Sequence, residues 1–84
     1  MHLEPEDTAA ITRRMKRAHG HLASVIRMLE EGADCEAALT QLAAVNKAIS
    51  RSGYALVSTG LQKCLVEGDE VDQAKLEKVF LALA

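Results

Sequence analysis

Cys35 and Cys64 are the residues of this 84-residue chain whose spacing points most directly to chemistry. In one continuous helix they would lie roughly 43 Å apart, so a single subunit cannot close a site with both thiols. At about 100° per residue their separation returns almost to the same angle, which places both on one stripe of the helix. If two copies pair antiparallel along that stripe, Cys35 of one subunit meets Cys64 of the other, and the two-fold axis makes a pair of equivalent sites.

The surroundings of the two cysteines favour regulation over catalysis. A thiol enzyme needs a pocket cysteine with a positioned base or a Cys-x-x-Cys motif, and the sequence shows neither. No signal peptide opens the chain and no apolar stretch approaches about 18 residues, so we expect a cytoplasmic protein that does not enter a membrane. Reduced, metal-binding or redox-active thiols are then expected. The plainer alternative is a structural helical bundle whose cysteines are small core residues.

Charge is strongly segregated along the chain, although the net charge is only −2. Residues 8–29 contain five basic residues and no acid, and residues 37–66 contain three basic residues and no acid. A solvated surface would mix the two signs more evenly, so the pattern predicts a basic patch for a polyanion despite the acidic pI of about 5.9.

The hydrophobic pattern predicts three helices. The first should begin near residues 4–7, where acids and a proline suit a helix start, and it carries a heptad seam of apolar residues. Gly32 should end it. Asp34 is a plausible N-cap for a second helix of about 30 residues, which should end at residues 68–69. The first seam comprises Ile11, Met15, Ala18, Leu22, Val25 and Leu29, and the second helix continues one face with Leu39, Leu42, Val45, Ile49 and Leu56.

A third, short helix is expected from about Asp72. The predicted fold class is therefore all-α, with residues 1–84 forming a single domain. Because burial is incomplete in so small a chain, we expect oligomerisation, with two antiparallel hairpins forming a four-helix bundle.

Several stretches resemble the CsoR/RcnR family of small bacterial repressors. They are residues 14–21 (RMKRAHGH), residues 27–31 (RMLEE), the Asp34-Cys35 pair and residues 39–45 (LTQLAAV). The resemblance covers nearly the whole chain. It implies a dimer that pairs into a homotetramer, binds operator DNA at a GC-rich inverted repeat in its resting form, and releases the DNA when an effector modifies the site between subunits. It also implies that the protein is not an enzyme and requires no cofactor.

The effector is the open question within that family. Copper-sensing members are expected to use a cysteine, then a His-x-x-x-Cys pair; Cys35 and Cys64 match, but Gly60 stands at the histidine position. Nickel and cobalt sensors also use that histidine, and formaldehyde-responsive members have a proline where this chain has His2. A dithiol without the imidazole resembles the persulfide-sensing, CstR-like branch. Cys35 would then accept sulfane sulfur, and Cys64 of the partner would close a disulfide, trisulfide or tetrasulfide.

Copper remains the alternative, because Cu(I) favours soft thiolates and tolerates two of them in a linear arrangement. Under that interpretation Cys35 and Cys64 are the metal ligands. Under either interpretation of the effector, the resemblance and the basic pattern together predict that basic side chains contact the DNA phosphates, without a helix-turn-helix motif. The predicted contacts are Arg13, Arg14, Lys16, Arg17, Lys47 and Arg51.

Overall fold

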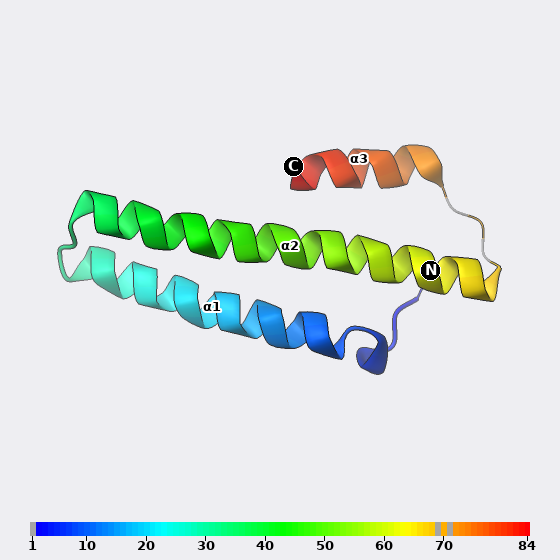
Figure 1. Cartoon of the computed structure of the whole chain (residues 1–84), viewed down its shortest axis with the longest axis horizontal. Helices are drawn as coiled ribbons and strands as arrows, with labels where there is room; N and C mark the ends of the chain where they lie inside the picture. Colours follow the sequence, from blue (N-terminus) through cyan, green and yellow to red (C-terminus); the bar gives the residue numbers. More distant parts are fainter. Residues whose placement is uncertain (1, 69, 71) are drawn as a thin grey trace.

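The computed structural model describes residues 2–68, 70 and 72–84. The described chain contains a 3₁₀ turn, η1 (Pro5–Asp7), and three α-helices: α1 (Ala9–Glu30), α2 (Cys35–Glu67) and α3 (Gln73–Leu83). Helices α1 and α2 form a long antiparallel hairpin, and α3 runs back along the opposite side of α2 (Figure 1). The predicted all-α fold is confirmed, and α2 is the central element that contacts both of the others.

The start of the first helix differs from the prediction. Residues 5–7 form a separate 3₁₀ turn, and α1 begins only at Ala9. The Asp7 carboxylate accepts a hydrogen bond of 2.9 Å from the backbone N–H of Glu4, which closes this turn on itself. Thr8 then has φ −118° and ψ 10°, outside the helical range, so the chain changes direction before α1.

Both ends of α2 lie where the sequence places them. The Asp34 carboxylate accepts a hydrogen bond of 3.1 Å from the backbone N–H of Ala37, which satisfies one of the free donors at the helix start. Gly68 adopts φ 73°, the left-handed conformation that ends helices and that glycine enters without a Cβ penalty.

The core between α1 and α2 repeats every seven residues on both helices. The buried residues of the two packed helices follow this repeat on each helix. Only half of the predicted α1 seam is buried in this way, because Met15 and Leu29 are 49% and 62% exposed. The seam consists of Ile11, Ala18 and Val25 on α1, and Ala38, Val45 and Ser52 on α2.

Helix α3 packs more lightly on the other side of α2. The rings of Tyr54 and Phe80 lie 5.1 Å apart between centroids, and the side chain of Leu83 lies against Gly53. No residue of α3 is buried. The helix is therefore held by a few contacts at its edge.

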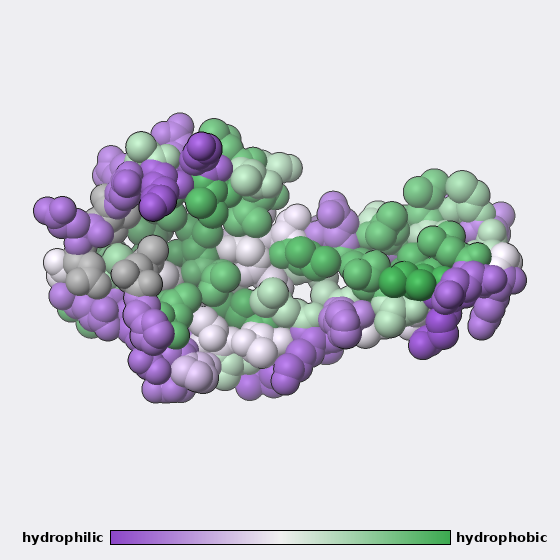
Figure 2. Space-filling model, turned by 180° about the vertical axis from the view of Figure 1, so that it is seen from behind, coloured by the Kyte–Doolittle hydropathy of each residue, from purple (hydrophilic) through white to green (hydrophobic). Residues whose placement is uncertain are grey.

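A row of large apolar side chains on α2 stays uncovered in the single chain. Leu39, Leu42 and Ile49 are 59%, 45% and 47% exposed, and of the predicted α2 face only Val45 is buried. Figure 2 shows this hydrophobic surface extending to the hairpin end of the molecule. No helix among the described residues is both long and apolar enough to cross a membrane.

Candidate thiol pair and basic groove

The two cysteines occupy opposite ends of α2 in different environments. Cys35 is the first residue of the helix and is exposed, whereas Cys64 is buried, with 1% of its surface exposed. Both are free thiols, and because α2 is one continuous helix they lie roughly 43 Å apart. Sequence spacing places both thiols on one stripe of the helix, but only Cys35 is open to solvent, because Cys64 is covered by its own subunit.

Gly60, one turn before Cys64, is buried and offers no side-chain donor. The histidines lie elsewhere: His2 is 3.2 Å from the Glu4 carboxylate, and His19 and His21 are on α1. Among the residues that the structure describes, no group of three or more His, Cys, Asp or Glu side chains is close enough to hold a metal ion. The two thiols lie at opposite ends of α2.

An ion pair ties the N-terminal turn to the end of α2. The Lys63 ammonium donates a hydrogen bond to the Asp7 carboxylate and lies 3.9 Å from the Glu67 carboxylate. This hydrogen bond is the main cause that lowers the pKa of Asp7, and it raises the pKa of Lys63. Lys63 directly precedes Cys64, so η1 is fixed beside the turn that carries the buried thiol.

Three of the six predicted DNA contacts gather in one groove. Arg14 and Arg17 of α1 and Arg51 of α2 line a cavity of about 490 Å³. Arg13, Lys16 and Lys47 are also exposed but do not line the groove. The remaining lining residues are Ala18, His21, Ala48 and Ser52.

His21 is a groove residue that the sequence interpretation did not select. Its Nε2 lies 2.6 Å from the Gln41 side-chain oxygen, which fixes the ring across the α1–α2 hairpin. The helical spacing could have indicated that His21 lies beside Arg14 and Arg17, because positions 14, 17 and 21 fall on one face of a helix. The Ser52 hydroxyl, in contrast, donates to the Ala48 carbonyl oxygen within its own helix.

The groove has a strong positive charge. Within the described part of the chain, none of the ion pairs involves Arg14, Arg17 or Arg51. Three guanidinium groups around one cavity repel each other unless an anion lies between them, and guanidinium geometry suits phosphate oxygens. The groove is therefore a candidate phosphate site.

Comparison with known proteins identifies the family of the chain. A family model described as metal-sensitive transcriptional repressor matches residues 7–84. The copper-sensing transcriptional repressor CsoR of Mycobacterium ulcerans (strain Agy99) is 38% identical over 55 residues, which are 66% of this chain and 47% of that protein. The CsoR of Mycobacterium tuberculosis (strain H37Rv) is 30% identical over 76 residues, 88% of this chain and 64% of that protein.

A third relative is YrkD of Bacillus subtilis (strain 168), an uncharacterized protein, 46% identical over 43 residues, which are 51% of this chain and 68% of YrkD. No solved structure matches the chain. The chain spans less than two thirds of the length of the two mycobacterial repressors that it matches. Because the family model extends over almost all of its residues, the chain belongs to the metal-sensitive transcriptional repressor family, the CsoR/RcnR family.

Proposed function

We propose that this protein is a DNA-binding repressor that releases its operator when Cys35 and Cys64 of neighbouring subunits are modified. The observation that carries the DNA-binding part is the groove in which Arg14, Arg17 and Arg51 converge. The names of the mycobacterial relatives, both transcriptional repressors, support the same function.

Assembly into an antiparallel dimer would bring the two thiols together. The exposed apolar row of α2 is the surface that such a dimer would bury, and Leu39, Leu42 and Ile49 supply its side chains. Pairing two hairpins along this row gives the expected four-helix bundle, and two dimers would form the tetramer.

Operator recognition would depend on phosphate contacts. The hairpin turn joins two long helices, with no short recognition helix, so the groove would lie along the DNA backbone and read a GC-rich inverted repeat partly through DNA shape. Removal of one phosphate contact should reduce the salt slope of binding by about one and weaken binding roughly tenfold.

DNA titrations at several salt concentrations test this assignment. We expect Arg17→Ala and Arg51→Ala to lower both affinity and salt slope. Lys78→Ala is the matched control, because it removes one exposed positive charge from α3, away from the groove. Unchanged affinity and slope for both arginine variants would reject the groove as the DNA contact.

For the effector we propose reactive sulfur, because Gly60 leaves the thiol pair without a third ligand. The Cys35 thiolate attacks the sulfane sulfur of a persulfide R–S–SH, forms Cys35–S–SH and releases RS⁻. The thiolate of the partner's Cys64 then attacks the inner sulfur, Sγ of Cys35, which forms the Cys35–Cys64 disulfide, breaks the Sγ–SH bond and releases HS⁻. Where Cys64 is itself persulfidated, the Cys35 persulfide anion attacks its inner sulfur, and a trisulfide forms with the same leaving group.

Cu(I) is the second candidate effector, favoured by the copper-sensing names of the mycobacterial relatives. Two thiolates can hold Cu(I) in a linear arrangement. The ligands would again be Cys35 of one subunit and Cys64 of the other, so both candidates use the same residues and differ in the chemistry at sulfur.

Non-denaturing mass spectrometry, with DNA release followed in parallel, separates the two candidates. Reduced protein is exposed separately to inorganic polysulfide and to buffered Cu(I). The proposal predicts a mass gain of sulfur atoms, covalent dimers and DNA release with polysulfide. Stoichiometric copper with DNA release, and no release with polysulfide, would establish the copper alternative.

A further inference from the structure

His21 lines the basic groove, but it is not among the predicted DNA contacts. It shares the cavity with the guanidinium groups of Arg14, Arg17 and Arg51 and is half-buried there. His19, two positions before it on α1, is exposed and does not line the cavity. Residues two positions apart do not share a face of a helix, so only one of the two histidines belongs to the groove.

The His21 ring is held by a hydrogen bond across the α1–α2 hairpin. Its Nε2 donates to the Gln41 side-chain oxygen over 2.6 Å, because an amide oxygen only accepts. A neutral imidazole with a hydrogen on Nε2 has none on Nδ1. In this arrangement Nδ1 donates to a ligand only after the ring has gained a proton. Gln41 is therefore a positioning residue for the ring.

The neighbours of the ring in the groove include no counter-charge for an imidazolium. The charged residues that line the cavity are Arg14 and Arg17 from α1 and Arg51 from α2. Within the part of the chain that the structure describes, no carboxylate lines it. The Ser52 hydroxyl donates to the Ala48 carbonyl oxygen in its own helix. An opposite charge for the ring must come from a ligand.

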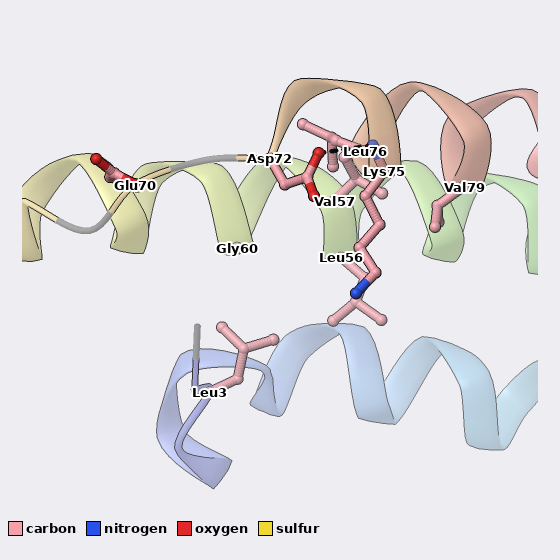
Figure 3. A pocket seen from close by; sticks show the side chains of 9 residues that line it. All are labelled: Leu3, Leu56, Val57, Gly60, Glu70, Asp72, Lys75, Leu76 and Val79. Atoms are coloured by element: carbon pink, nitrogen blue, oxygen red, sulfur yellow. Dashed lines mark hydrogen bonds between the residues drawn. The ribbon is translucent and has the colours of Figure 1, made fainter.

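A second cavity of similar size does not suit an anion. It has about 480 Å³ of space between α2 and α3, and Leu56 and Leu76 are among its apolar side chains (Figure 3). The carboxylates of Glu70 and Asp72 line it beside the ammonium group of Lys75. A phosphate would meet net negative charge in this cavity and net positive charge in the groove.

We infer that His21 is a fourth phosphate contact of the groove and that it binds DNA as the imidazolium, with Nδ1–H donating to a phosphate oxygen while Nε2–H stays on Gln41. The charged ring is favoured in the complex, because a charge-assisted hydrogen bond to phosphate is stronger than a neutral one. The added proton comes from solvent, so each groove takes up about one proton when DNA binds. This contact rests on the proposed function and adds a pH dependence to it.

Proton uptake determines the direction of the pH effect. Histidine is the side chain that ordinarily changes charge between about pH 8 and about pH 5. When the complex holds one more proton than the separate molecules, affinity rises as pH falls, by at most about tenfold per pH unit. Arginine stays charged over this whole range, so the three guanidinium groups add no such dependence.

Titration of the reduced full-length protein with labelled double-stranded DNA of mixed sequence, at low salt and at about pH 8 and about pH 6, tests this contact. Phosphate contacts are independent of sequence, so a mixed-sequence duplex is a sufficient probe. His21→Gln retains a side-chain amide for Gln41 but cannot become charged. We expect this variant to bind like the unaltered protein near the higher pH, and about tenfold more weakly with a salt slope lower by about one near the lower pH.

His19→Gln is the matched control, because it removes an exposed histidine from the same helix and changes the overall charge equally. It should retain the full pH dependence. If His21→Gln retains it as well, or binds more weakly by the same factor at both pH values, the imidazolium contact is wrong. Circular dichroism verifies the helices of both variants.

Calorimetry of the unaltered protein in buffers of different ionisation enthalpy counts the protons without any substitution, and no uptake near the lower pH would also overturn the contact. Arg17→Ala and Arg51→Ala separate this failure from that of the proposed function. If both weaken binding while the pH effect is absent, only the His21 contact fails. If neither weakens binding, the groove itself is not the DNA contact.

Discussion

At the scale of single residues, Arg13 and Arg14 differ in position although the sequence predicts the same DNA-contacting role for both. Arg13 and Arg14 are both exposed and both predicted to contact DNA, yet only Arg14 lines the groove with Arg17 and Arg51. Adjacent helical residues point about 100° apart, so one of a pair of equal charges can face the ligand while the other faces solvent.

This difference gives a prediction with its own internal control. Arg14→Ala should weaken operator binding about tenfold, because in the proposed complex a guanidinium in the groove would contact phosphate directly. Arg13→Ala removes the same charge one position away and should have a smaller effect. Fluorescence anisotropy with labelled operator DNA measures both, and equal losses would show that overall charge, and not the groove, determines affinity.

The Asp7–Lys63 ion pair predicts a pH dependence of stability. The hydrogen bond from Lys63 lowers the pKa of Asp7 below its ordinary value of 3.8. A carboxyl group with a lowered pKa stabilises the folded state above its unfolded pKa, and this contribution disappears as pH falls through the folded pKa. The protein should therefore be more stable than its Asp7→Asn variant at neutral pH, and the difference should begin to shrink near pH 3.8 and vanish only when the pH is below the lowered pKa of the folded state.

Urea unfolding across this pH range measures the difference. Glu6→Gln, in the same 3₁₀ turn, is the control for removing a nearby exposed carboxylate. A difference between the protein and Asp7→Asn that persists undiminished in acid would show that the ion pair is not its cause.

At the scale of elements, the bounds of α2 follow from local signals. Asp34 accepts the backbone N–H of Ala37, so Asp34→Ala should lower the free energy of unfolding by about 1 kcal/mol. Glu36→Ala, two residues along in the first turn, retains the cap and should change stability less. Chemical denaturation of both variants measures this, and equal losses would assign the effect to charge at the helix start.

These local signals explain which parts of the fold the sequence predicts. The cap at Asp34 and the left-handed Gly68 bound α2 without help from distant residues, and the prediction of both is confirmed. The separate turn before α1 was missed, although the hydrogen bond from the Glu4 N–H to Asp7 that closes it is local; the second contact of Asp7, with Lys63, joins positions 56 residues apart. A pattern of acids and a proline cannot distinguish that turn from a first helical turn.

The burial of Cys64 was missed for a similar reason. Helical spacing correctly places Cys35 and Cys64 at the two ends of one helix, but it says nothing about which parts of the chain pack over them. The ion pair that ties the N-terminal turn beside Cys64 joins Asp7 to Lys63, which lie far apart in the sequence. The predicted pairing of the two cysteines across a dimer stays a prediction.

At the scale of the whole molecule, the exposed apolar row on α2 should hold the dimer together. Leu42 is 45% exposed in the single chain, and a glutamate there would place a charge in the proposed interface. Leu42→Glu should therefore reduce the mass observed by sedimentation to that of smaller assemblies. Leu81→Glu, on the outer side of α3, tests whether a new charge alone has this effect. An unchanged mass for Leu42→Glu would place the interface elsewhere.

The central claim is that Cys35 of one subunit reacts with Cys64 of its neighbour. Subunits with Cys35→Ser and subunits with Cys64→Ser are mixed, allowed to exchange, treated with inorganic polysulfide and separated by non-reducing electrophoresis. The account predicts that the mixture forms a covalent dimer, because each mixed pair retains one complete site, and that neither variant alone forms one. A covalent dimer from the Cys64→Ser variant alone, or none from the mixture, would contradict the account.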